Sequence, residues 1–102
     1  MRLAVVNHQD YFAKIADDHK FPIHKFGELA NYLIQNKIVD KFYKPYECSF
    51  ETLNYAHSRE YIFNVKNKTL EKDRIKKIGF PLIDSVIRRS LVATGGTVLA
   101  SK

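Results

Sequence analysis

Apolar residues follow two different spacings along the first half of this chain. Residues 3–6 form a short, fully apolar and β-branched run, which is typical of a buried strand. Residues 39–43 are β-branched and aromatic and stop before Pro45, so they predict a second strand. Between them, after Pro22, helical spacing predicts an amphipathic helix of about three turns. Its apolar positions are Phe26, Leu29, Ala30, Leu33 and Ile34.

This order of elements predicts an α/β protein. A strand, a helix and a second strand within about forty residues indicate a parallel, right-handed βαβ unit. The remaining residues have helical patterns, so we expect one or two parallel strands followed by mostly helical segments. At 102 residues, the chain forms at most one domain, spanning residues 1–102.

The second half contains several helix start signals. Ser49 and Ser58 are predicted N-caps, with Glu51 well placed in the first turn after Ser49. Pro81 predicts the first turn of a final helix. That helix should bury one apolar stripe and expose its two arginines, Arg88 and Arg89. The stripe comprises Ile83, Ile87, Leu91 and Val98.

Gly95 and Gly96 lie near the end of the same predicted helix. Two glycines inside a helix cost about 1 kcal/mol each relative to alanine, so their presence needs a compensating reason. We expect a close approach of neighbouring backbone at these positions. A break near the helix C-terminus is the alternative.

The chain is basic, with a formal net charge of +6. Residues 66–77 contain six lysines or arginines and two acidic residues, which gives this segment +4 of that total. Such a run attracts phosphate, so a small nucleic-acid-binding module is one hypothesis. However, no aromatic residue interrupts the run to stack on bases, and a solvated helix or loop is the interpretation we favour.

Few residues of the sequence suggest catalytic chemistry. The sequence has no GxSxG, GxxxxGK or GxGxxG motif, and no metal-binding spacing joins its four histidines. His19 and His24 are five residues apart with Pro22 between them, so we expect polar loop residues rather than metal ligands. Cys48 is the only cysteine, which we expect to be a buried, unreactive thiol in a reducing cytoplasm. No apolar run approaches the length of a membrane span or a signal-peptide core.

Five short motifs, taken in order, resemble the N-terminal part of the histone deacetylase family, most closely its bacterial deacetylase-like and class IV branches. The resemblance covers essentially the whole chain. The motifs are His19-Lys20-Phe21-Pro22 with Lys25, Lys44-Pro45, Ala56-His57-Ser58 with Tyr61-Ile62, Ile78-Gly79-Phe80-Pro81, and Gly95-Gly96-Thr97.

The resemblance implies an arginase/deacetylase-type α/β fold and hydrolysis of acetyl-lysine or related amides. In that family, one zinc ion held by two aspartates and a histidine activates water, assisted by two adjacent histidines. The present sequence has no His-His pair. No catalytic residue and no metal ligand is therefore carried over, and we expect no zinc and no hydrolysis from this chain alone.

The resemblance does assign substrate-channel positions. Lys25 falls where the family has a basic residue near the internal channel below the metal. Phe80 and Pro81 fall on the loop that forms one rim of the substrate tunnel, where lysine deacetylases have an aspartate that holds the substrate backbone. An ordinary core aromatic is an equal alternative for Phe80. As partners, we expect either a separately encoded remainder of the domain or self-association through uncovered apolar surface.

Overall fold

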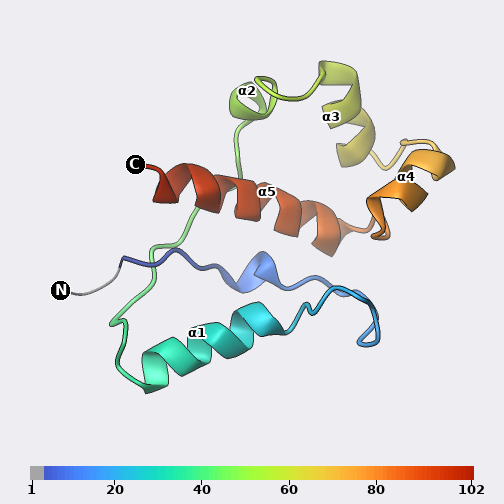
Figure 1. The fold of residues 1–102 in the computed structure, drawn as a ribbon. Helices are drawn as coiled ribbons and strands as arrows, with labels where there is room; N and C mark the ends of the chain where they lie inside the picture. Colours follow the sequence, from blue (N-terminus) through green and yellow to red (C-terminus); the bar gives the residue numbers. More distant parts are fainter. Residues whose placement is uncertain (1–3) are drawn as a thin grey trace.

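The computed structural model describes residues 4–102, and its regular elements are almost entirely helical (Figure 1). A single 3-10 turn, η1 (Gln9–Tyr11), comes first, and α1 (Lys25–Gln35) follows a long irregular segment. Three short helices come next and a long one completes the chain. They are α2 (Phe50–Leu53), α3 (Arg59–Lys66), α4 (Lys72–Ile78) and α5 (Asp84–Ala100).

The prediction of an α/β fold of the arginase/deacetylase type is wrong, because residues 4–102 are mostly helical and form no strand or sheet. In the described residues, the two segments expected to be strands meet at one isolated parallel bridge, between Val6 and Tyr43. The Asn7 amide donates to the Tyr43 carbonyl at 3.1 Å, and the Tyr43 amide donates to the Val5 carbonyl at 2.9 Å. Leu3, the first residue of the predicted strand, lies outside the described residues.

The pairing stops at one bridge because the strands lack what stabilises a parallel sheet. Parallel strands need cover on both faces, and two strands alone are marginal in water. Here Tyr43 is 50% exposed. The β-branched pattern of residues 39–43 therefore reflects local propensity that no neighbouring layer extends into a sheet.

The helix start signals are largely confirmed. The Ser49 hydroxyl accepts a hydrogen bond from the Thr52 amide at the start of α2, and the Ser58 hydroxyl accepts one from the Tyr61 amide at the start of α3. The prediction that Pro81 begins the last helix is wrong, because α5 starts at Asp84. Phe80 and Val86 both pack on one core cluster, and residues 81–83 span the distance between them as extended chain.

The core is small and lies between η1, α5 and the irregular segment before α1. Ala13, Ile15 and Ile23 form its centre, and Phe21, Phe80 and Val86 pack around them. On α5 the most buried side chain is Val92. In Figure 1, the N-terminal segment runs between α5 and α1. The helices α2, α3 and α4 lie on the opposite side of α5 from that segment.

The molecule is thin and open for its size. Its extents are 46 × 34 × 17 Å and its radius of gyration is 15.2 Å, against about 13 Å for a compact domain of this length. Its accessible surface is 7952 Å², whereas a folded monomer of 11.9 kDa exposes about 6,000 Å². The chain therefore exposes roughly 2,000 Å² more than a self-contained domain of its mass.

Candidate functional site: the Gly79–Pro81 loop and the groove beside α5

His19 connects two of the segments that carry the resemblance. Its Nδ1 accepts a hydrogen bond from the Phe21 amide at 3.0 Å. Its Nε2 lies 2.8 Å from the Gly79 carbonyl oxygen, which only accepts, so the ring is the neutral tautomer with its proton on Nε2. The imidazole also stacks on Phe80, with centroids 5.0 Å apart and planes 14° apart. His19 thus ties the loop after α4 to the segment before α1, across sixty residues of sequence.

Gly79 directs the chain into this contact. It ends α4 in the left-handed region, with φ at 83°, and its amide donates to the Ile75 carbonyl at 3.3 Å. A side chain is strained at this φ, which explains why a glycine ends the helix here. The turn brings Phe80 against His19 and Phe21.

The structure brings Phe80 and Pro81 together but places Lys25 elsewhere. Phe80 packs on the core cluster, as expected of an ordinary core aromatic, and it also lines the groove described below; its role at the rim of a substrate tunnel stays a prediction. Pro81 is exposed on the same groove. Lys25 is exposed at the start of α1, with its Nζ 5.1 Å from the Phe26 ring and 5.6 Å from the Phe21 ring, and does not line this groove.

Arg89 shares these two aromatic rings with Lys25. Its guanidinium carbon lies 5.0 Å from both ring centroids, and its Nε donates to the Tyr11 carbonyl at 2.8 Å. Burial lowers the pKa of Arg89. The prediction that Arg89 lies on the solvent-exposed face of the last helix is therefore wrong. The sequence contains a partial signal for this inward position, because Arg89 lies on the same face of the helix as Val92 and Gly96.

Arg88 does face solvent and holds three segments together. Its Nε donates to Asp10 at 2.9 Å and its Nη1 pairs with Glu47. The hydrogen bonds that Arg88 donates to the carboxylates of Asp10 and Glu47 raise the pKa of its guanidinium. Asp10 and Glu47 lie 78 and 41 positions away from Arg88 in the sequence. No local signal pairs residues that far apart, so sequence reasoning missed this network.

The close approach of backbone predicted at the two glycines of α5 is confirmed at Gly95, whereas the close neighbour of Gly96 is a side chain. A Cβ on Gly95 would overlap the backbone oxygen of Tyr46, and a Cβ on Gly96 would overlap the hydroxyl of Tyr11. The Cys48 amide donates to the Leu91 carbonyl at 3.0 Å, which holds the chain before α2 against this part of the helix. Cys48 itself is buried, as expected.

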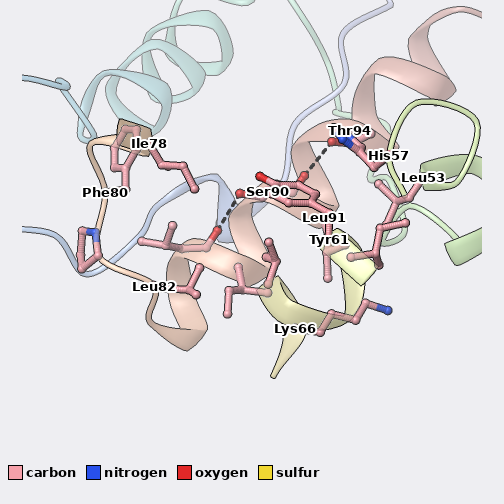
Figure 2. Close-up of a pocket in the computed structure, with 15 residues that line it drawn as sticks. Leu53, His57, Tyr61, Lys66, Ile78, Phe80, Leu82, Ser90, Leu91 and Thr94 are labelled. Atoms are coloured by element: carbon pink, nitrogen blue, oxygen red, sulfur yellow. Dashed lines mark hydrogen bonds between the residues drawn. The ribbon is translucent and has the colours of Figure 1, made fainter. Parts of the chain in front are cut away.

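An apolar groove lies between α5 and α3 (Figure 2). Its volume is about 190 Å³, and the loop after α4 closes one end. Ser90 and Thr94 on its floor donate their hydroxyl protons to the carbonyls of Val86 and Ser90, at 3.0 and 2.8 Å. The residues that line it are Leu53, His57, Tyr61, Ile62, Val65, Lys66, Ile78, Phe80, Pro81, Leu82, Val86, Ile87, Ser90, Leu91 and Thr94.

The described residues do not form a zinc site. Within residues 4–102, no three side chains of His, Cys, Asp or Glu gather closely enough to hold a metal ion. His19 is engaged with Gly79 and Phe21, while His24 lies 3.1 Å from Asp17 on the surface. His57 is exposed beside Tyr61. That the chain by itself binds no zinc stays a prediction.

No family model matches the chain, and no solved structure matches it significantly. The chain is similar to an uncharacterized protein of the cyanobacterium Picosynechococcus sp. (strain PCC 7002), with 31% identity over 104 residues. The match covers 100% of this chain and 35% of the relative, so the chain spans about a third of the relative's length. Since 104 residues make up 35% of it, the relative is about 300 residues long. Within residues 4–102, no helix has the length and apolar character needed to cross a membrane.

Proposed function

We propose that residues 1–102 are the channel-rim segment of a cytoplasmic deacetylase-family zinc amidohydrolase, acting on acetyl-lysine or a related amide. The chain by itself is inactive, and the zinc ligands and catalytic histidines come from the remaining part of the enzyme. The observation that carries the proposal is the contact through His19, because it joins residues 19–22 and 79–81, two of the segments that carry the resemblance.

The shape of the molecule supports a missing remainder. The chain exposes roughly 2,000 Å² beyond what a self-contained domain of its mass exposes. Obligate interfaces bury about 1,000–2,500 Å² on each side, so the excess has the size of one such interface. The longer relative supports the same view, because two-thirds of its length lies outside the match.

The proposal is tested by joining the chain to that remainder. The full chain is produced together with the part of the Picosynechococcus protein outside the match. The purified complex is assayed for zinc by mass spectrometry and for hydrolysis of an acetyl-lysine peptide and an acetylated small amine. We expect one zinc per complex and hydrolysis of at least one substrate, with neither in the chain alone.

A matched pair of variants ties the activity to the rim. Phe80→Leu keeps an apolar side chain but removes the ring that faces His19, and should lower kcat/KM about tenfold. Phe63→Leu alters a ring on α3 that is 62% exposed and outside the groove, and should leave kcat/KM unchanged. If the complex and the intact relative both lack zinc and hydrolyse neither substrate, the proposal is wrong.

A further inference from the structure

The groove between α3 and α5 is built from an apolar stripe that the sequence marks for burial. Ile87 and Leu91 belong to the stripe expected on the buried face of the last helix, yet both are only half-buried and line the groove. Ile78, at the end of the groove near α4, is 42% exposed. A helix that is apolar on more than one face is normally covered on each of them. The face of α5 toward Gly95 and Gly96 is covered in this structure, and the groove face is open.

The floor of the groove suits an apolar occupant better than a polar one. Ser90 and Thr94 are the polar side chains of α5 that line the groove, and both donate their hydroxyl protons to carbonyls within the helix. They therefore present mainly carbon to whatever lies above them. Small polar ligands are fixed by several convergent polar groups, which this floor does not provide.

The length of the groove and the charge of the residues around it indicate what kind of segment it binds. From Val86 to Thr94, the part of α5 that lines the groove extends about 12 Å, at 1.5 Å per residue, which matches about two turns of a helix. Lys66 lies at its edge and begins the run 66–77, whose net charge is +4. In this run, Lys68 is paired with Asp84 at 2.6 Å. The surroundings of the groove therefore favour an occupant with acidic residues beside its apolar face.

We propose that the groove receives an amphipathic helix of about two turns with acidic flanking residues, supplied by the part of the longer protein that residues 1–102 do not include. This proposal depends on the proposed function in one respect only, namely that a remaining part of the protein exists. The uncovered area of roughly 2,000 Å² is large enough for such a contact. Recognition is of the helix-in-groove type, in which apolar side chains three and four residues apart enter the groove.

The test compares arginine substitutions at one serine and two threonines of α5. Thr94→Arg and Ser90→Arg place a long cation on the floor, whereas Thr97→Arg changes an exposed threonine of the same helix that lies outside the groove. Thr94 and Thr97 both donate their hydroxyl protons to the carbonyl four residues earlier, so the two substitutions cost α5 the same bond. All three positions are exposed, and circular dichroism of the full chain checks that each variant folds.

Binding is measured between the tagged full chain and the co-produced part of the Picosynechococcus protein outside the match. We expect Ser90→Arg and Thr94→Arg to weaken binding at least tenfold and Thr97→Arg to leave it unchanged. Equal binding by all three variants overturns the proposal, as does no binding by the unmodified chain. The readout is binding, so a complex that binds through the groove but holds no zinc would refute the deacetylase function alone.

A second measurement separates this occupant from a second copy of the chain. We expect sedimentation velocity of the full chain between 5 and 200 µM to show a monomer. In a monomer, no second copy covers the groove. A dimer that Thr94→Arg dissociates and Thr97→Arg preserves would assign the groove to self-association and overturn the proposal.

Discussion

Replacing Gly95 by alanine is the sharpest test of how α5 is held. In an exposed helix, this change would stabilise the protein by about 1 kcal/mol, because alanine is the better helix former. At Gly95 the new Cβ would overlap the backbone oxygen of Tyr46 and also lie 3.3 Å from the Cys48 amide nitrogen. Backbone cannot rotate away as a side chain can, so the segment 46–48 must shift.

The magnitude follows from the contacts that this shift disturbs. Overpacking of a filled site costs about 1–3 kcal/mol. The hydrogen bond from the Cys48 amide to the Leu91 carbonyl is worth about 1 kcal/mol and would be strained or lost. Against the gain in helix propensity, the net effect is a loss of about 2 kcal/mol of unfolding free energy, or about 8–16 °C in Tm for a domain of this size.

Gly27→Ala is the matched control. Gly27 lies inside α1, and a Cβ there would meet no atom within 4 Å. This variant should gain about 0.5–1 kcal/mol from propensity alone. Both variants are measured by urea unfolding, followed by circular dichroism at 222 nm. The close-packing argument fails if Gly95→Ala is as stable as the wild type, or if the two variants shift in the same direction.

Three further perturbations test other contacts. His19→Ala removes two hydrogen bonds and a ring stack, so it should destabilise by about 2 kcal/mol in urea unfolding; His24→Ala, which loses an exposed pair with Asp17 and a tilted ring contact with Phe12, should cost under about 1 kcal/mol, and equal losses would refute the role of His19. Burial raises the pKa of Tyr11 above its ordinary value of 10.0, outweighing the opposing effect of Arg89. The neutral phenol therefore stabilises the fold below pH 10, and this stability is lost as the pH rises through the raised pKa; unfolding between pH 9 and 11.5 should show a steeper loss than in Tyr11→Phe, and identical slopes would contradict the burial argument. Ser58→Ala should lower stability by about 1 kcal/mol through loss of the cap on α3, whereas Ser101→Ala, after the end of α5, should change it little; the reverse order would show that α3 does not depend on its cap.

The helices could be read from the sequence because their signals are local. The hydroxyl of Ser58 reaches an amide three residues away, and the apolar spacing of α1 repeats within a single element. Gly95 was readable for a related reason, since the cost of a glycine inside a helix predicted a close neighbour, which is the backbone of Tyr46. None of these inferences required knowing what lay across the chain.

The site was less accessible to such reasoning. Phe80 and Pro81 were placed on one loop by their motif, but the partner of Phe80 is His19, sixty residues away. Lys25 lies on the aromatic rings of Phe21 and Phe26 rather than on the groove. The groove itself joins α3 and α5, and nothing in the spacing of either helix says that the other stands beside it.

The sequence by itself determined where α2 and α3 begin through their serine caps, and it predicted the close approach of backbone that the structure shows at Gly95. The tertiary structure decided the rest. It limited the predicted strands to one bridge at Val6 and Tyr43, moved the start of α5 to Asp84, turned Arg89 inward and left the apolar stripe of Ile87 and Leu91 open. The physical reason is that caps and helical spacing act within one turn, whereas sheet pairing and burial depend on surfaces brought together from distant parts of the chain.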